Sequence, residues 1–271
     1  MTSPQPEPYD LAVMIDDLPW TAAGSAPADV VDGGTANILD ALASRAVTAT
    51  GFIVCDAMAA RPGQIERWLA TGQSLGNHTQ SHPDLNTTPV AQYLDGVRSC
   101  DTSIRAAGAN PTHFRYPMLH RGDRQAKRDT VAVTIAGMVY TVAPVTIDNS
   151  EWILASAYER AARSGDSTAM TRLGESYIEH IREAAGHARE VARERFGREV
   201  AQILLLHANR LNADWLGQLL DSLVAGGARF VSLESALRDP VYGHGGRLCG
   251  ACRSLLALPR RAGAAGPRRM G

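Results

Sequence analysis

The sequence predicts one parallel α/β sheet, either open or closed into a barrel. Candidate strands and helices alternate about seven times along the chain, and such alternation is typical of βαβ units. The length of 271 residues suits one barrel or one large core. Polar side chains capable of chemistry directly follow several of the strands. In a parallel barrel the carboxyl ends of the strands share one face, so we expect these side chains to meet there.

The predicted strands rest on apolar alternation and on β-branched residues. The first covers residues 9–17, where apolar residues occupy alternate positions before two adjacent carboxylates, Asp16 and Asp17. The strand predicted at 47–55 is rich in β-branched residues. Further strands are predicted in the short apolar stretch before His78 and at 113–117, 138–148, 200–206 and 229–233.

The predicted helices rest on apolar residues at helical spacing and on residues that begin or end a helix. Pro62 begins one helix, and Gly72 ends it. In the longest, residues 167–196, the apolar residues form one stripe while arginines and glutamates fill the rest, which is typical of a solvated outer face. The other helices are predicted at 35–45, 89–107, 123–136, 152–163 and 215–224.

Two histidines, His78 and His82, lie four residues apart. On one turn of helix this spacing places both side chains on the same face, roughly 5–6 Å apart at Cβ. Two converging imidazoles are suitable ligands for zinc. A bare pair at this spacing is more often solvated, by about three to one, so further residues are needed to indicate a metal site.

Those further residues lie at the ends of other predicted strands: Asp16, Asp17, Arg115, Asp148 and His207. One carboxylate and two histidines would supply three ligands, and three protein ligands leave a coordination position open, which is typical of catalytic zinc. A second carboxylate could take a proton from water, and a histidine from another strand could protonate a leaving group. The pattern therefore indicates a hydrolytic metal site.

Five short motifs occur in order along the chain: Ile15-Asp16-Asp17, His78-Thr79-Gln80-Ser81-His82, Arg115-Tyr116-Pro117, Asp148 with Trp152, and Leu205-Leu206-His207. In these motifs the sequence resembles the polysaccharide deacetylases, the metal-dependent carbohydrate esterases that share the NodB-homology domain. The resemblance implies a distorted (β/α) barrel over residues 1–240 and removal of an acyl group, such as acetyl, from an amide nitrogen.

The resemblance also implies roles for these residues. Asp16 would be the general base, His207 the general acid, and Arg115 would orient Asp16 with help from Asp148. The implied metal ligands are Asp17, His78 and His82, and the implied pocket walls are Trp152 and Leu205. Zinc is the default metal, although Co²⁺, Ni²⁺ or Fe²⁺ would fit the same ligands.

One motif departs from the family pattern, in which an aromatic residue and a glycine follow the proline of the third motif. Here Met118 and Leu119 follow Pro117, so the Met118 amide is the candidate donor to the oxyanion. Since no leader is visible, we expect a small soluble N-acyl substrate or an N-acetylated sugar.

Two other functions are compatible with parts of the pattern. Gly76-Asn77-His78 also occurs in metal-dependent phosphoesterases, but the remaining motifs of those enzymes are absent from the sequence. A catalytically inactive barrel that only binds a sugar or a partner is the other alternative. Loss of Asp16, a metal ligand or His207 would be expected in such a protein, and all of them are present.

The net charge, the apolar stretches and the cysteine content of the sequence predict which partners the chain does not bind and in which compartment it acts. The net charge of −1 offers no electrostatic basis for binding nucleic acid. Without a leader or an apolar stretch of membrane-spanning length, the sequence predicts a cytoplasmic protein with no membrane partner. The four cysteines are too few and too scattered for a disulfide framework.

Residues 241–271 are rich in glycine, alanine and arginine, so we expect a poorly ordered tail there.

Overall fold

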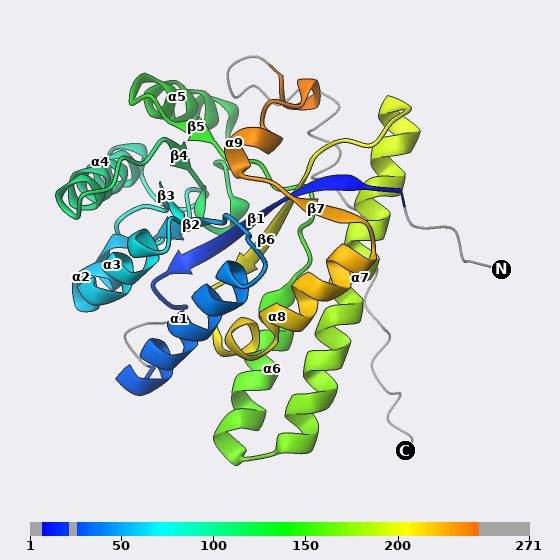
Figure 1. The fold of residues 1–271 in the computed structure, drawn as a ribbon. Helices are drawn as coiled ribbons and strands as arrows, with labels where there is room; N and C mark the ends of the chain where they lie inside the picture. Colours follow the sequence, from blue (N-terminus) through cyan, green and yellow to red (C-terminus); the bar gives the residue numbers. More distant parts are fainter. Residues whose placement is uncertain (1–6, 22–25, 244–271) are drawn as a thin grey trace, which may run out of the picture.

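The computed structural model describes residues 7–21 and 26–243. Within them, seven strands form one parallel sheet in the order β5-β4-β3-β2-β1-β6, and β7 also pairs with β1. The strands are β1 (Tyr9–Leu18), β2 (Thr50–Ile53), β3 (Ser74–Asn77), β4 (His113–Phe114), β5 (Thr141–Val142), β6 (Gln202–His207) and β7 (Ala228–Phe230). Helices surround the sheet, and α6 and α7 form a long hairpin at one side of the molecule (Figure 1).

The α-helices of the described chain are α1 (Ala28–Ala43), α2 (Cys55–Ala60), α3 (Pro62–Ala70), α4 (Val90–Ala106), α5 (Gln125–Gly137), α6 (Glu151–Ser164), α7 (Ser167–Phe196), α8 (Arg210–Ala225) and α9 (Leu233–Ala236). Two single 3₁₀ turns are η1 (Pro117–Leu119) and η2 (Pro240–Tyr242). Two helices begin several residues earlier in the structure than the sequence analysis predicted. The first starts at Ala28 and packs Gly34 against Trp20, and α8 starts at Arg210, where the Asn209 side chain accepts a hydrogen bond from the Asn212 amide at 3.0 Å.

The sheet is curled, since the segment that follows β5, at one edge of the sheet, pairs with β6 at the other edge. After β5, Ile147 forms a parallel bridge with Leu204, and the amides of Thr146 and Ile147 both donate to the Ile203 carbonyl. The predicted strand at 138–148 is therefore wrong as one continuous element. Pro144 lies in its middle and has no N–H to donate to a ladder, which explains the interruption.

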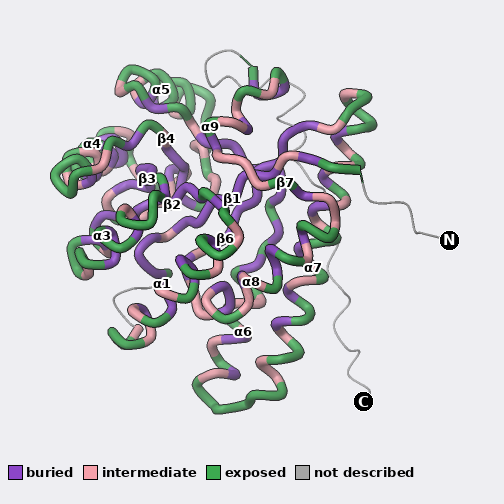
Figure 2. The backbone as a smooth tube through the Cα atoms, in the orientation of Figure 1, coloured by how far each residue is buried: buried purple, intermediate pink, exposed green. Residues whose placement is uncertain are grey.

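The strands separate two apolar clusters. On one face of the sheet, alternate residues of β1 such as Leu11, Val13 and Ile15 pack with apolar residues of α1, α7 and α8. On the other face, Ala12 and Met14 belong to a second cluster, with apolar residues of β2, β6, α9 and η2. Figure 2 shows buried residues along the strands and on helix surfaces that face them. This alternation follows from the two-residue period of a strand.

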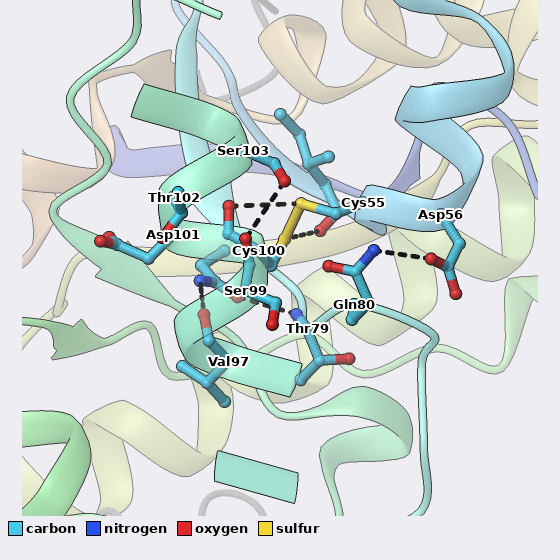
Figure 3. The surroundings of a disulfide bond; sticks show 12 residues. Cys55, Asp56, Thr79, Gln80, Val97, Ser99, Cys100, Asp101, Thr102 and Ser103 are labelled. Carbon is cyan, nitrogen blue, oxygen red and sulfur yellow. Dashed lines mark hydrogen bonds between the residues drawn. A yellow bond between two sulfur atoms is a disulfide. The ribbon is translucent and has the colours of Figure 1, made fainter. Parts of the chain in front are cut away.

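A disulfide joins Cys55, the first residue of α2, to Cys100 in α4 (Figure 3). The prediction that the cysteines form no disulfide framework missed this bond. The two cysteines are 45 positions apart in sequence, and only the packing of α2 against α4 brings them together. Cys249 and Cys252 lie outside the described residues.

The described chain ends in packed structure. Val241 and Tyr242 are buried, and the Tyr242 hydroxyl donates to the Ala201 carbonyl at 2.5 Å. The packed region therefore reaches two residues beyond the predicted boundary at 240, and the tail predicted to be poorly ordered lies, from residue 244 on, outside the described residues. No helix among the described residues is both long and apolar enough to cross a membrane.

Candidate active site

The site lies at the carboxyl ends of β1, β3 and β6, of which β6 pairs with β1 while β2 lies between β1 and β3. Asp16 and Asp17 are near the end of β1, His78 directly follows β3, and His207 is the last residue of β6. Asp16 and His207 are register partners on adjacent strands. The expectation that side chains from separate strand ends meet at one face is met for these residues.

Asp17, His78 and His82 form a group that could hold a metal ion, with one ligand atom from each within 4.8 Å of the others. Asp17 Oδ1 lies 3.6 Å from His78 Nε2 and 3.3 Å from His82 Nε2. Asp17 has a left-handed backbone conformation (φ 63°), which aspartate tolerates better than most residues. The turn at the end of β1 thereby points the Asp17 carboxylate toward both imidazoles.

The two histidines meet through a loop, and the prediction that they lie on one helical turn is wrong. Thr79 and His82 both have positive φ angles, 72° and 56°. The Thr79 amide donates to Asn77 Oδ1 at 2.8 Å, and the His82 amide donates to Thr79 Oγ1 at 3.1 Å. These side chains compete with helical hydrogen bonds, which explains why the chain turns here without forming a helix.

His78 is fixed in the tautomer that a metal ligand needs. Its Nδ1 lies 2.9 Å from the Arg115 carbonyl, and because a carbonyl can only accept, Nδ1 carries the proton. Nε2 is then left with a free lone pair facing Asp17. Burial lowers the pKa of His78 to about 3, so the ring stays neutral at ordinary pH.

Six buried polar atoms at this site have no hydrogen-bond partner within the described chain. They are Asp16 Oδ1, Asp17 Oδ1, His78 Nε2 and the three guanidinium nitrogens of Arg115. Buried polar groups are nearly always satisfied, so such a cluster indicates a missing partner. Two imidazole nitrogens and a carboxylate oxygen are typical zinc ligands. The residues present therefore fit a divalent metal.

Asp16 lies deeper than Asp17 and is 3% exposed. Burial raises the pKa of its carboxyl group, while the charges of Arg115, His207 and His82 oppose that rise. Arg115 Nε lies 3.9 Å from Asp16 Oδ2, and the Arg115 guanidinium lies over the Phe52 ring at 4.9 Å. Arg115 therefore faces Asp16 as predicted, at ion-pair distance and without a hydrogen bond.

Asp148 was predicted to help Arg115 orient Asp16. It is exposed, and its charge favours the protonated form of Arg115, raising the Arg115 pKa against the larger effect of burial. No hydrogen bond joins Asp148 to Arg115 within the described residues. Its effect on Asp16 is thus indirect.

The sequence analysis missed Glu151, the carboxylate that holds His207. His207 Nδ1 donates to Glu151 Oε2 at 2.7 Å. The other oxygen, Oε1, accepts from the Asn209 and Asn212 side chains at 2.6 and 2.7 Å. Glu151 is 1% exposed and is the first residue of α6. The sequence feature that could have indicated Glu151 is its position three residues after Asp148 and next to Trp152.

The surroundings of His207 favour its charged form. Burial alone lowers its pKa, but the hydrogen bond and charge of Glu151 outweigh this, with help from Asp17 and Asp16, and raise the pKa of His207 to about 9. His207 is thus protonated at neutral pH and can donate a proton.

The three predicted pocket residues differ in exposure. Leu205 is buried, whereas Trp152 and Met118 are 60% and 50% exposed. Leu205 precedes His207 by two positions on β6, so both side chains lie on the same face of the sheet. Met118 belongs to η1, and both it and Leu119 have positive φ angles, 55° and 56°.

Comparison with known proteins gives one family match. Residues 4–133 match the polysaccharide deacetylase family model. The chain is 38% identical over 85 residues to a chitooligosaccharide deacetylase of Bradyrhizobium sp. (strain ANU 289), a match covering 31% of this chain and 39% of that protein. The match therefore spans about two-fifths of that relative's length.

Solved structures match a larger part of the chain at lower identity. A family 4 carbohydrate esterase from Streptomyces lividans in complex with acetate has a TM-score of 0.55 at 19% identity, over 84% of this chain and 95% of that one. A CE4 family pseudoenzyme from Bacillus anthracis has a TM-score of 0.60 at 14% identity, over 86% and 66%. These likenesses confirm the predicted distorted (β/α) barrel. Residues 4–133, just under half of the chain, are thus similar to the polysaccharide deacetylase family both in the family model and in the ordered motifs.

Proposed function

We propose that this protein is a metal-dependent deacetylase that removes the acetyl group from an amide nitrogen of an N-acetylated sugar. The observation that carries the proposal is the convergence of Asp17, His78 and His82 beside a separate buried carboxylate, Asp16. The matched relative named a chitooligosaccharide deacetylase supports the substrate class. Chitooligosaccharides are therefore the first substrates to examine.

Asp17, His78 and His82 would hold the metal, for which zinc is the first choice and Co²⁺, Ni²⁺ or Fe²⁺ fit the same donors. When bound, the metal would supply Lewis acidity toward the acyl oxygen and toward water. His78 is suited to this role because its ring is neutral and its Nε2 is not used by the protein. Asp16, 3.8 Å from His78 Nε2, would remain outside the ligand set.

Asp16 and His207 would move the protons. Asp16 would accept the proton of the attacking water; burial raises the pKa of its carboxyl group, and the positive charge of Arg115 opposes that rise and favours the ionised form. His207, protonated at neutral pH, would give its proton to the departing nitrogen, which is a poor leaving group without it. Glu151 would hold the His207 ring in position through both steps.

The backbone and the exposed apolar side chains would bind the substrate. The first N–H groups of a helical turn are not used within it, so the Met118 amide is a candidate donor to the oxyanion. Trp152 and Met118 are exposed apolar side chains on segments next to the site, and Leu205 lies beside His207. We propose that they contact the acetyl group and the apolar face of the sugar.

Acetate release tests this function. The zinc-loaded protein is incubated with N-acetylglucosamine oligomers, and acetate is measured over time, with phosphate esters in parallel. The proposal expects acetate release that stops on chelation and returns with zinc. Phosphate release without acetate would instead support a phosphoesterase. Zinc binding without turnover of either substrate class would support an inactive binding protein.

The place of action is a further part of the proposal. A buried disulfide is typical of proteins that fold in oxidising compartments. The Cys55–Cys100 bond therefore favours such a compartment over the cytoplasm predicted from sequence. The two are distinguished by the oxidation state of these cysteines in protein taken from its native cell under acid quenching.

A further inference from the structure

The loop that carries the two histidines has an unfavourable backbone. Thr79, a β-branched residue, and His82 both have positive φ angles. For a β-branched residue this conformation is an outlier, and such conformations persist only where the surrounding structure enforces them. The contacts that enforce it therefore determine where His78 and His82 point.

One support of the loop is the start of α2. The Cys55 amide donates to the Thr79 carbonyl at 3.2 Å, and the Asp56 amide donates to the Gln80 carbonyl at 2.8 Å. The Gln80 side chain in turn donates to Asp56 Oδ1 at 2.6 Å (Figure 3). Two consecutive loop carbonyls are thus bound by two consecutive amides of α2.

The other support is α4. Asn77 accepts from the Thr79 amide through Oδ1 and donates through Nδ2 to the Val97 carbonyl of α4 at 2.9 Å. Gly96 also lies against the loop, since a Cβ there would be 3.6 Å from Gln80 Cβ. The loop is thereby held between α2 and α4.

The disulfide connects these two supports. Cys55 is the residue whose amide binds Thr79, and Cys100 lies one turn beyond Val97 in α4. Both cysteines are buried, at 1% and 0% exposure. We propose that the Cys55–Cys100 disulfide is a positioning element for the metal ligands, fixing α2 and α4 so that the loop holds His78 and His82 toward Asp17. This inference rests on the proposed function for the identity of the bound group.

A purely stabilising disulfide is the alternative, and the replacement of both cysteines by serine distinguishes the two. The Cys55 sulfur lies 3.4 Å from the Cys100 carbonyl oxygen. The Cys100 sulfur lies 3.6 Å from the Ile53 carbonyl oxygen. Serine hydroxyls at the same positions would find these acceptors close by. The double variant therefore removes the covalent bond with little other change to the polar contacts.

The experiment measures two properties of the double variant, Cys55→Ser with Cys100→Ser. The first is zinc affinity, by competition with a chromophoric chelator well below the unfolding temperature. The second is hydrogen exchange at the Thr79 and His82 amides in the metal-free protein. We expect zinc affinity to fall roughly 10–100-fold, the range for losing a residue that orients metal ligands, and both amides to exchange faster.

The matched control is Leu223→Ala. Leu223 is a buried residue of α8 in the apolar cluster shared with α1, so its truncation lowers stability without touching the loop. The control should leave zinc affinity and exchange at Thr79 and His82 unchanged. A double variant that behaves like the control, less stable but with unchanged affinity and loop exchange, would overturn the inference.

If the double variant does not fold, the unaltered metal-free protein is compared before and after reduction of the Cys55–Cys100 bond, verified by thiol counting, and zinc affinity should fall on reduction. Unchanged affinity and unchanged exchange at Thr79 and His82 in the reduced protein would then overturn the inference. If the unaltered protein binds no zinc, the proposed function fails, and hydrogen exchange in the metal-free protein still decides whether the disulfide fixes the loop.

Discussion

At the scale of single residues, the two proposed proton-transfer groups are held in different ways. Asp16 faces Arg115 at 3.9 Å without a hydrogen bond, so mainly charge acts between them. His207 is hydrogen-bonded to Glu151, whose second oxygen is saturated by two asparagine side chains. The position and the charge of His207 therefore depend on one buried residue.

Replacing Glu151 by Gln should lower both the activity and the upper pH limit of activity. Glu151 raises the pKa of His207 to about 9, so its removal lowers that pKa. An acid must be protonated to act, and the alkaline fall of kcat/KM should therefore shift to lower pH. We also expect roughly a 10–100-fold loss of turnover, measured as acetate release across pH 6–10.

The control for this variant is Glu159→Gln on the same helix, α6. Glu159 pairs with Arg163 and Arg210 near the surface, away from His207. Its variant should keep the pH profile of the unaltered protein. An unchanged profile in Glu151→Gln would mean that Glu151 does not set the charge of His207.

The sequence could predict which residues meet at the site but not all their partners. Asp16, Asp17, His78 and His207 meet because parallel strands end on one face, a property of the fold class. Glu151 could not be found this way, since it is the first residue of helix α6 and does not follow a strand. An acidic residue in the first turn of a helix is also favourable without any catalytic role.

At the scale of elements, the contact between α7 and α8 depends on a glycine. A Cβ at Gly174 would lie 1.9 Å from Trp215 Cε2, so α7 approaches α8 closely only because Gly174 has no side chain. Gly186, on the same helix, has nothing within 4 Å of its Cβ position. Substitutions at the two glycines therefore distinguish the effect of close helix packing from the effect of helix propensity.

Gly174→Ala should destabilise the protein by about 1–3 kcal/mol, because the added methyl group forces α7 away from Trp215. Gly186→Ala should instead stabilise it by about 0.5–1 kcal/mol, because alanine favours helix more than glycine. Urea unfolding of both variants measures these changes. A gain in stability for both would refute the proposed close packing at Gly174.

The turn η1 has two consecutive residues with left-handed backbone, Met118 and Leu119. Glycine adopts this conformation without the steric cost that a Cβ adds. Leu119→Gly should therefore be more stable than Leu119→Ala by about 0.5–1 kcal/mol, since both remove the leucine side chain and only alanine keeps a Cβ. Thermal or urea unfolding measures the difference, and equal stabilities would show that the turn relaxes.

Element boundaries were predictable where the pattern was regular. The helix predicted at 167–196 is observed as Ser167–Phe196, because its apolar stripe is long and Gly197 ends it. The strand predicted at 138–148 was wrong because the chain crosses between the two edges of the sheet at Pro144. Which edge a segment reaches depends on distant strands, which a local pattern does not reveal.

At the scale of the whole molecule, the strand order explains how distant segments form one site. β6 pairs directly with β1, whereas β2 separates β3 from β1, and the loop after β3 reaches across the end of β2 to bring His78 and His82 to Asp17. The alternation of strands and helices predicted a parallel sheet, and the ordered motifs predicted the barrel type. The disulfide between α2 and α4 depends on this arrangement and could not be predicted from the spacing of the cysteines.

The most direct test of the account is zinc binding by two single variants, Asp16→Asn and Asp17→Asn, measured by calorimetry on metal-free protein alongside acetate release. The unaltered protein should bind one zinc ion per chain. Asp16→Asn should retain zinc while losing roughly 10²–10⁴-fold in turnover, the usual effect of removing a general base, and Asp17→Asn should lose zinc. Loss of zinc in Asp16→Asn together with retention in Asp17→Asn would contradict the assigned roles.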